Sequence, residues 1–392
     1  MAGSVIVAGA RTPIGKFQGG LSSVSATDLG GAAIAGALAK AGISGDDVDY
    51  AIMGQVILAG SGQVPARQAA VAGGLPMSVP SHLVNKACLS GLNAIHQADL
   101  MIAAGEADIV VAGGMENMTR APYLLLEGRS GFRYGDGTVH DSMQKDGLTC
   151  AFDICAMGES TERYAASKDI ARGPQDEIAA ASHERAAAAQ KDGLFDAEIV
   201  PFEIPQRKGD PIVISEDEGI RPGTTAEKLG GLRPAFAESG NITAGNASQI
   251  SDGGAAVVVM SKAKAEELGL APLAEIVSFG QVAGPNTSLL NQPSQAALAA
   301  LAKAGLGVGD VDLFEINEAF AAVALASMDE LGVSTDIVNV NGGAIALGHP
   351  IGASGTRLAL HAALELGRRG GGLAMATLCG GGGQGDAMLL KV

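Results

Sequence analysis

Tryptophan is absent from this chain of 392 residues, and aromatic residues make up only 3% of it. Charged residues are also scarce, at 17%, where a soluble domain usually has about 25%. Hydrophobic residues reach 47%, and a chain with this composition is not intrinsically disordered. The 57 glycines follow no G-X-Y period, which excludes a collagen-like fibre. At about 150 residues per domain, the length predicts two to three domains with a sizeable buried core.

Basic residues are the minority among the charges. The chain has 26 Lys and Arg residues and 42 Asp and Glu residues, so its formal net charge is −16. This excess of negative charge argues against a nucleic-acid partner. An anionic small substrate remains compatible with it, but would need a local basic patch.

Cysteine is scarce as well, with Cys88, Cys150, Cys155 and Cys379. These residues are too few and too scattered for a disulfide framework, and no paired CxxC spacing indicates a metal site. No apolar run reaches the roughly 18 residues that a membrane span needs. The first residues are typical of a strand, not of a signal peptide. We therefore expect a soluble protein of the reducing cytoplasm, with no membrane partner.

Apolar runs alternate with Ala-rich stretches, a pattern that predicts a layered α/β fold. Strands are expected at Ser4–Ala8, Tyr50–Val56, Ile109–Ala112, Ala255–Met260, Asp336–Val340, Leu373–Thr377 and Ala387–Leu390. Helices are expected at Thr27–Ala41, Ser90–Ala104, Asp176–Lys191, Ser294–Ala304, Ala319–Leu331 and Ser354–Arg369. Each of these helices ends near a glycine, which can serve as its C-terminal cap.

The chain also contains an internal repeat. The hexamer ALAKAG occurs at 37–42 and again at 300–305, and each copy is followed by DVD and an apolar strand. Further on, Ser-Gly opens a predicted helix at Ser90 and at Ser354. An ordered series of this kind predicts two half-domains of the same topology.

One long insertion separates the first half from its last strand. Residues 119–248 have no counterpart in the second half, and they hold 14 of the 26 basic residues. The enrichment indicates either solvated peripheral surface or cationic contacts to a phosphate-bearing ligand. We expect residues 1–118 and 249–270 to form the first half, 119–248 an inserted loop domain, and 271–392 the second half.

Cys88 is the first candidate for chemistry. It lies in VNKACLSG, between a predicted strand and the helix that begins near Ser90. The positive end of a helix dipole favours a thiolate, which would make Cys88 a nucleophile. The alternative is a small buried hydrophobic residue, a common role for a free cysteine.

His349 lies in NGGAIALGHPIGASG, a glycine-rich turn that leads into a helix. The repeat makes this turn the counterpart of the Cys88 turn, so the two should meet and pair a thiol with an imidazole. That pair is the arrangement of a nucleophile and its base. The alternative is a histidine that only caps its own turn.

Cys379 ends a predicted strand and is followed by four glycines. Glycines let backbone N–H groups approach a ligand closely, which suits an oxyanion hole, although a tight connection between strands is the alternative. Asn317, in EINEAF, could hold a water with its amide or cap a helix. Cys150 and Cys155 have no histidine beside them, and we expect structural or pocket-lining roles. The glycine pairs do not form the GxGxxG fingerprint, so a dinucleotide is not expected.

Taken together, CLSG at Cys88, GGMENM at 113–118, NEAF at 317–320, GHP at 348–350 and CGGGGQG at 379–385 resemble the motifs of the thiolase family. The resemblance covers essentially the whole chain, in the family's order and spacing. It implies a five-layered α/β/α/β/α fold of two similar halves, with a loop domain that binds coenzyme A. It also implies a homotetramer built as a dimer of dimers.

The resemblance assigns a role to each matching residue. Cys88 would be the nucleophile that becomes acylated, and His349 would activate it and contribute to an oxyanion hole. Asn317 would hold the water that completes this hole. Cys379 would take or return the α-proton. The backbone N–H groups of Cys88 and Gly381 would form a second oxyanion hole.

Further residues match positions that contact coenzyme A in the family. They are Arg221, Ser248, Phe236, Phe320 and Met157. The implied reaction condenses two acetyl-CoA to acetoacetyl-CoA and CoA through an acyl-cysteine, in a ping-pong sequence. It needs no metal and no redox cofactor.

Two departures from the family pattern concern the substrate. Ala156 stands where short-chain members commonly carry His, and the segment 281–294 is altered. Both face the acyl pocket in the family, so a 3-ketoacyl-CoA thiolase for longer or branched chains is the alternative. A ketosynthase, a cysteine protease and a non-catalytic protein with this fold are the remaining alternatives.

Overall fold

The structure, a computed structural model, describes residues 3–392, and its framework is one hydrogen-bonded sheet. The strand order is β14-β15-β16-β13-β1-β12-β5-β3-β4, with β2 paired to β12. These strands are β1 (Ser4–Arg11), β2 (Gly15–Lys16), β3 (Tyr50–Gly54), β4 (Ser81–Val84), β5 (Ile109–Asn117), β12 (Ser251–Ser261), β13 (Ala274–Ala283), β14 (Leu313–Ile316), β15 (Leu373–Gly380) and β16 (Gln384–Lys391).

The sheet consists of two halves with the same strand order. Outward from the centre, β1-β12-β5-β3-β4 corresponds to β13-β16-β15-β14. The halves join where β1 pairs with β13, through only Val5–Glu275 and Ile6–Ala274. The repeat in the sequence therefore corresponds to a repeat in the topology, as predicted.

Helices lie between the two halves of the sheet and on the outer face of each half, which gives five layers. The helices outside the insertion are α1 (Ala26–Ala41), α2 (Pro65–Ala72), α3 (Ser90–Ala103), α7 (Lys262–Glu267), α8 (Gln292–Ala304), α9 (Ala321–Leu331), α10 (Ala344–Leu347) and α11 (Ser354–Arg368). One central hydrophobic cluster joins α3 and α11 to strands of both halves. A second cluster packs α1 and α2 on the outer face of the first half, and a third packs α8 and α9 on that of the second. The predicted five-layered fold is confirmed.

Because both faces of the sheet are covered, its strands are buried throughout. In β5, Val110 and Ala112 face the central cluster, whereas Ile109 and Val111 face the outer one. Alternate residues of a strand point to opposite faces. A strand that is buried on both faces therefore appears in the sequence as a continuous apolar run.

Helix ends agree with the prediction better than helix starts. Gly42, Gly305 and Gly332 follow α1, α8 and α9 in the left-handed conformation, with φ of 69°, 69° and 67°. These are the expected glycine caps. At the other end, α5 (Arg172–Lys191) begins four residues before the predicted Asp176.

The predicted strand at 336–340 is wrong. Only Val338 pairs there, in an isolated bridge to Phe314, at the position that corresponds to β4 in the first half. Asn339 leaves the extended conformation with a φ of 46°. Its side-chain amide bonds both the N–H and the carbonyl of Ile316, at 2.9 and 2.8 Å. Backbone bonds join Phe314 only to Ile337 and Asn339, at 2.8 and 2.9 Å, and the Asn339 side chain takes the place of the next ladder bonds.

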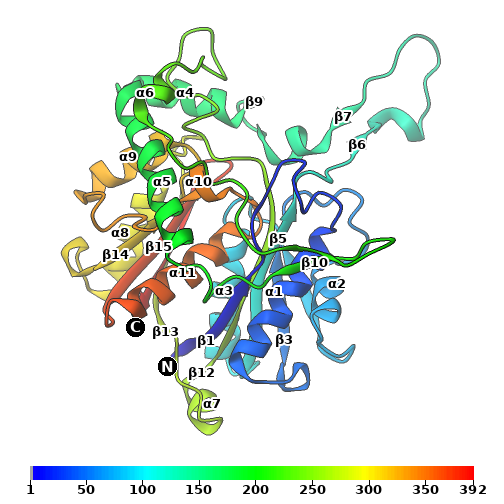
Figure 1. Ribbon diagram of the computed structural model, residues 1–392, viewed down its shortest axis with the longest axis vertical. Coiled ribbons are helices and arrows are strands. Elements are labelled where there is room, and N and C mark those ends of the chain that lie inside the picture. The colour runs from blue at the N-terminus through cyan, green and yellow to red at the C-terminus, as the bar shows by residue number, and fades with distance from the viewer. Residues whose placement is uncertain (1–2) are drawn as a thin grey trace.

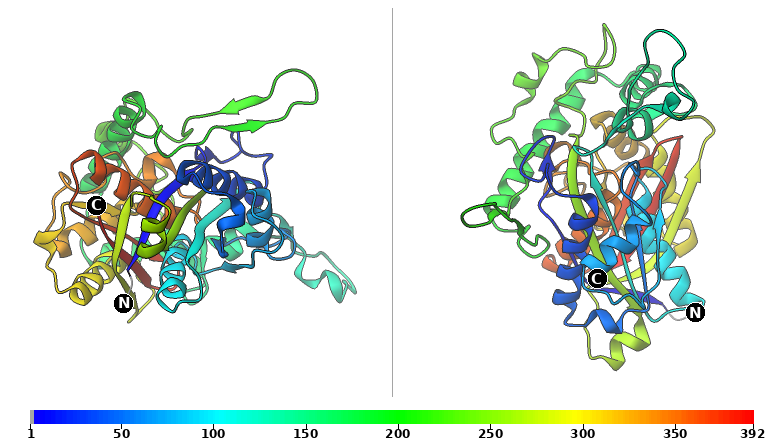
Figure 2. Two further views of the ribbon diagram at one scale, coloured as in Figure 1. Left: turned by 90° about the horizontal axis from the view of Figure 1, so that it is seen from below. Right: turned by 90° about the vertical axis from the view of Figure 1, so that its right-hand side faces the viewer.

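The insertion lies over one end of the sheet (Figure 1). Its elements are β6 (Tyr123–Leu124), β7 (His140–Asp141), β8 (Thr149–Cys150), β9 (Cys155–Ala156), α4 (Met157–Ser167), α5, β10 (Phe202–Ile204), β11 (Ile212–Ile214) and α6 (Ala226–Gly230). Two arms project from the body, one between β6 and β7 and one formed by β10 and β11 (Figures 1 and 2). The exact domain boundaries stay a prediction. No helix in the described part of the chain is long and apolar enough to cross a membrane.

Candidate active site

Cys88 lies in the loop between β4 and α3, where its thiol is half-buried. The backbone N–H groups of Cys88 and Gly381 lower the pKa of the Cys88 thiol, but burial outweighs them and raises it to about 12. Burial therefore opposes the effect expected of the helix dipole, which favours the thiolate. A neutral thiol in this position needs a base to become a nucleophile.

His349 is buried and makes a hydrogen bond with each ring nitrogen. Its Nδ1 lies 2.6 Å from the Ser354 hydroxyl, and its Nε2 lies 3.5 Å from the Asn317 amide nitrogen. Burial and the nearby Arg357 cation lower the pKa of His349 to about 3. The imidazole is therefore neutral and can accept a proton. Its contact with Ser354 lies within its own turn, so the turn-capping interpretation is also partly correct.

Asn317 follows β14 directly and is fully buried. It does not cap α9, because the residue at the cap position is Phe320. Its amide nitrogen reaches His349, and its Oδ1 is buried without a hydrogen-bond partner in the described part of the chain. A buried amide oxygen in this state is suited to hold a water.

Cys379 is fully buried near the end of β15. Burial and the neighbouring Cys88 raise the pKa of its thiol. The glycine run that follows begins with Gly380 and Gly381, and the backbone N–H of Gly381 lowers the pKa of the Cys88 thiol. The structure therefore brings both thiols and the glycine loop together, as predicted.

The Cys88 and His349 loops meet between the two halves of the sheet. Cys88 packs in one hydrophobic cluster with Ile351, two residues after His349. The helices that follow these loops also touch, because the Thr356 hydroxyl donates to the Gly91 carbonyl at 3.0 Å. The two loops therefore meet, as the internal repeat predicts, whereas the pairing of the Cys88 thiol with the His349 imidazole stays a prediction.

Glu116 lies in the GGMENM motif at 113–118, and the sequence predicted no role for it. Its buried carboxylate accepts the N–H groups of Val56, Ile57 and Gly352 at 3.0 to 3.1 Å. It thereby ties the loop after β3 to the loop that carries His349. Burial raises the pKa of Glu116 to about 8. Sequence reasoning missed this link because its partners are backbone groups far apart in the chain.

A cavity of about 520 Å³ opens beside this cluster. All the residues that the resemblance assigned to coenzyme A line it: Met157, Arg221, Phe236, Ser248 and Phe320. They come together because Ala247 bridges Phe320 and the Ser248 N–H bonds the Ala319 carbonyl at 3.0 Å. The rings of Phe236 and Phe320 pack edge to face, with centroids 6.2 Å apart. Lining residues that the sequence did not single out include Lys16, Phe17, Gln144, Leu148, Gln249 and Ile250.

Residues that line the cavity also pack in the two hydrophobic clusters that contain the thiols. Leu148 and Ile250 belong to the hydrophobic cluster that contains Cys88. Met157, Phe236 and Phe320 belong to the cluster that contains Cys379. An apolar chain that entered the cavity would therefore lead toward the two sulfur atoms.

Two cations line this cavity in an otherwise acidic protein. Lys16 comes from β2, and Arg221 comes from the insertion. This pair is a local basic patch of the kind that an anionic ligand would need.

The two departures from the family pattern, Ala156 and the segment 281–294, lie beside different cavities. Ala156 lines the cavity. In contrast, residues 282–286, 288, 291 and 292 line a different cavity of about 570 Å³. Leu289 and Leu290 pack in the cluster around Cys379. Within residues 3–392, no member of the segment 281–294 lines the 520 Å³ cavity, which differs from the expectation that this segment faces the acyl pocket.

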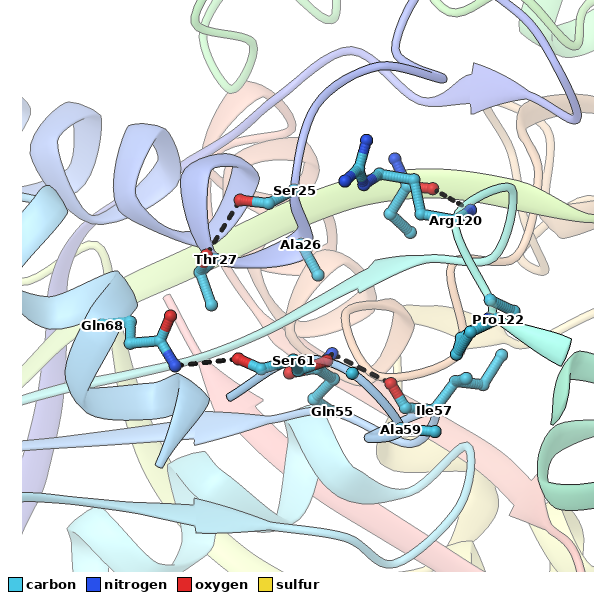
Figure 3. A pocket seen from close by; sticks show the side chains of 13 residues that line it. Ser25, Ala26, Thr27, Gln55, Ile57, Ala59, Ser61, Gln68, Arg120 and Pro122 are labelled. Carbon is cyan, nitrogen blue, oxygen red and sulfur yellow. Dashed lines mark hydrogen bonds between the residues drawn. The ribbon is translucent and has the colours of Figure 1, made fainter. Parts of the chain in front are cut away.

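A further cavity of about 490 Å³ lies beside the start of α1 and the end of β3 (Figure 3). Polar groups of Gln55, Gln68 and Arg120 line it (Figure 3). None of the predicted site residues takes part in it, so it is not the candidate active site. Among residues 3–392, no three His, Cys, Asp or Glu side chains gather in a group that could hold a metal ion.

The described site therefore combines a nucleophile, a neutral base, a second thiol and converging N–H donors. A thioester is an acyl donor that a cysteine can attack once a base has taken its proton. N–H groups directed at the sulfur are placed to stabilise an oxyanion on the attached carbonyl carbon. The arrangement is suited to acyl transfer through a cysteine.

Comparison with known proteins agrees with this chemistry. Residues 4–263 match the family model "Thiolase, N-terminal domain", and residues 270–392 match "Thiolase, C-terminal domain". The chain is 59% identical over 391 residues to a probable acetyl-CoA acetyltransferase of Mycobacterium tuberculosis, with all of both chains covered. It is 50% identical over 388 residues to the acetyl-CoA acetyltransferase of Cupriavidus necator, covering 99% of this chain and 98% of that one. The crystal structure of the Bacillus anthracis acetyl-CoA acetyltransferase is similar with a TM-score of 0.97 at 40% identity, covering 100% of this chain and 99% of that one.

The raised pKa of Cys88 predicts how its reactivity depends on pH. Because the thiolate is the reactive form, the alkylation rate of Cys88 by iodoacetamide should rise about tenfold per pH unit from pH 7 to 9. Mass spectrometry of the Cys88 peptide at timed intervals measures this rate. A rate that reaches a plateau below pH 7 would instead reveal a resting thiolate–imidazolium pair.

Proposed function

Because the chain belongs to the thiolase family, we propose that this acyltransferase interconverts two acetyl-CoA with acetoacetyl-CoA and CoA. The matches to the two thiolase family models and to the acetyl-CoA acetyltransferases confirm the family and the enzyme class that the resemblance implied. The proposal concerns the substrate, the ping-pong course of the reaction and the role of each residue.

One observation carries the proposal. The residues selected as coenzyme A contacts come from separate parts of the chain, yet all line one cavity, and several residues of its wall pack in the clusters that contain Cys88 and Cys379. The cavity combines basic groups, which suit phosphates, with an apolar wall, which suits a pantetheine chain. This combination supports a coenzyme A thioester as the substrate.

In the first step, His349 Nε2 takes the proton of the Cys88 thiol, and the thiolate attacks the carbonyl of acetyl-CoA. The N–H groups of Cys88 and Gly381 stabilise the tetrahedral oxyanion. The C–S bond to CoA then breaks, and the departing CoA thiolate takes the proton from His349. The products of this step are free CoA and acetyl-Cys88.

In the second step, His349 Nε2 takes the proton of the Cys379 thiol, and the resulting Cys379 thiolate removes an α-proton from a second acetyl-CoA. His349, together with a water held by Asn317, stabilises the enolate oxygen. The Ser354 hydroxyl lies 2.6 Å from His349 Nδ1 and 3.0 Å from the Pro350 carbonyl. By turning between these acceptors, it lets Nε2 act as acceptor or donor. The enolate carbon then attacks acetyl-Cys88, the bond between the acetyl carbon and the Cys88 sulfur breaks, and acetoacetyl-CoA is released. The departing Cys88 thiolate takes the proton from His349, which restores both thiols and the neutral imidazole.

The proposed reaction uses no metal and no redox cofactor, since the protein supplies the base and both sets of donors. All four cysteines are free thiols, which fits a reducing compartment. The cytoplasm stays the expected location.

A specific observation favours a second candidate substrate. Ala156 lines the cavity with a side chain of one carbon where short-chain members commonly carry His. The extra space supports 3-ketoacyl-CoA substrates with longer or branched chains as the alternative. A non-catalytic role is disfavoured because the chain retains all four proposed catalytic side chains close together: Cys88, Asn317, His349 and Cys379.

We further propose assembly into a homotetramer. The arm between β6 and β7 exposes Tyr123, Leu125, Phe132 and Tyr134, an unusual number of large apolar side chains for a free surface. Apolar groups gathered in this way mark contacts with another protein. A second copy of the chain that uses the same arm would bury them in pairs.

Two substitutions separate the roles of the two thiols. Cys88→Ser should abolish acyl-enzyme formation because the hydroxyl is a poor nucleophile here. Cys379→Ser should still form acetyl-Cys88 but lose condensation, because the α-proton has no acceptor. Intact-mass spectrometry after mixing with acetyl-CoA, followed by a condensation assay, tests both. An acetyl group on another residue, or normal condensation by Cys379→Ser, would contradict the assignment.

Thiolysis by free CoA tests the substrate. Acetoacetyl-CoA should be cleaved with the highest kcat/KM when compared with a longer 3-ketoacyl-CoA and a 2-methyl-branched one. Ala156→His should reduce the rates with the longer and branched substrates by about tenfold or more, because it fills the cavity. Preference of the unaltered protein for a longer or branched substrate would favour the alternative.

The arm substitutions Tyr123→Glu and Tyr134→Glu together should lower the molar mass from that of a tetramer to that of a smaller assembly. Light scattering coupled to size-exclusion chromatography measures the mass. Ile212→Glu with Val213→Glu, on the other projecting arm, is the matched control and should not change it. Equal masses for the unaltered protein and the Tyr variant would disprove the role of this arm.

A further inference from the structure

Cys150 and Cys155 lie opposite each other in the short hairpin of β8 and β9, where they are paired in register. Both are free thiols, and neither lines the cavity or takes part in the proposed reaction. From this placement we infer that Cys150 and Cys155 form a reversible disulfide, and that this dithiol is an oxidation site separate from Cys88 and Cys379.

The geometry of a hairpin suits the cross-link. Residues directly opposite in an antiparallel ladder have Cα atoms about 4.5 to 5.5 Å apart and point to the same face. Disulfides join Cα atoms about 4.4 to 6.8 Å apart. A small adjustment of the two side chains is therefore enough to form the bond.

The surroundings make the pair accessible and give it a defined order of reaction. Phe152 and Ile154 at the tip of the hairpin are exposed, and Cys155 is partly exposed whereas Cys150 is buried. Arg163 Nη2 lies 3.3 Å from the Cys155 sulfur, where its charge stabilises a thiolate. Burial still raises the pKa of Cys155, so oxidation should be slow at neutral pH and faster as the pH rises.

The reaction needs a two-electron oxidant, for which a hydroperoxide is the natural class. The Cys155 thiolate attacks the peroxide oxygen, the O–O bond breaks, and Cys155 becomes a sulfenic acid. Cys150 then displaces the hydroxyl group and forms the S–S bond. With hydrogen peroxide, the two thiols lose two electrons and two protons, and two waters are produced. A dithiol reductant reverses the change.

The hairpin touches the proposed active site at two points and the neighbouring segment 281–294 at a third. Ala156 and Met157 continue from β9 into the wall of the cavity. The Phe152 ring lies against Gly382 in the glycine loop after Cys379. The Asp153 carboxylate accepts the Thr287 hydroxyl at 2.6 Å. Tightening the hairpin should therefore alter the acyl pocket, a consequence that depends on the proposed function, whereas the disulfide itself does not.

Peptide mapping tests the disulfide directly. The full-length Cys88→Ser protein is oxidised with hydrogen peroxide, alkylated and digested with trypsin. Lys145 and Arg163 bound one tryptic peptide that contains both cysteines. This peptide should lose two hydrogens and resist alkylation, and chymotryptic cleavage after Phe152 should yield two fragments joined by the disulfide. Alkylation of both thiols after oxidation, or a peptide that carries only sulfenic or higher acids, would overturn the inference.

A second measurement tests the consequence for activity. The unaltered protein and Cys155→Ser are oxidised in parallel, and thiolysis is measured before and after a dithiol reductant. Both retain Cys88, so damage to Cys88 affects them equally. The unaltered protein alone should show a reversible, several-fold change in KM. If the peptide map shows the disulfide but KM stays constant, the coupling to the pocket is wrong; if neither protein has activity before oxidation, the proposed function is wrong instead.

Discussion

The contact between the two halves where α3 meets α11 is the constraint on which the rest of the site depends. A Cβ atom on Gly355 would come within 2.4 Å of the Leu92 nitrogen, and one on Gly114 within 1.9 Å of the Gly352 carbonyl. Side chains at these positions would force the backbones apart. Only this close approach brings the loop of Cys88 against the loop of His349. The Glu116 carboxylate stabilises the contact by accepting the Gly352 N–H.

The same approach determines the electrostatics of the site. Closing the halves removes water from both thiols and from His349, so each is neutral at rest. A helix dipole or a pair of N–H donors contributes a partial charge, whereas desolvation acts on a full charge. Desolvation is therefore the larger effect. In such a site charge develops only when substrate is present, and the donors at Cys88 and Gly381 are already oriented toward it.

Much of the fold could be predicted from particular residues. The ALAKAG copies and the two Ser-Gly helix starts indicated the duplicated topology, because repeated local sequence builds repeated local structure. The prediction of a strand at 336–340 was wrong because the side chain of Asn339, and not its backbone, makes the hydrogen bonds to Ile316. β13 was missed because its sequence combines a charge, polar residues and a glycine among the apolar ones. In both cases the outcome depended on a distant partner strand, which local pattern does not contain.

For the site, the sequence by itself determined the chemical inventory: two thiols, an imidazole, an amide and a glycine run, each beside a predicted strand or helix end. Which residues would face coenzyme A was implied only by the resemblance to the thiolase family. Only the tertiary structure decided the neutral state of Cys88 and His349, the single cavity shared by Arg221 and Phe320, and the face-to-face placement of Cys150 and Cys155. The physical reason is that burial and separation are properties of the packed chain. They arise when segments hundreds of residues apart exclude water from the space between them.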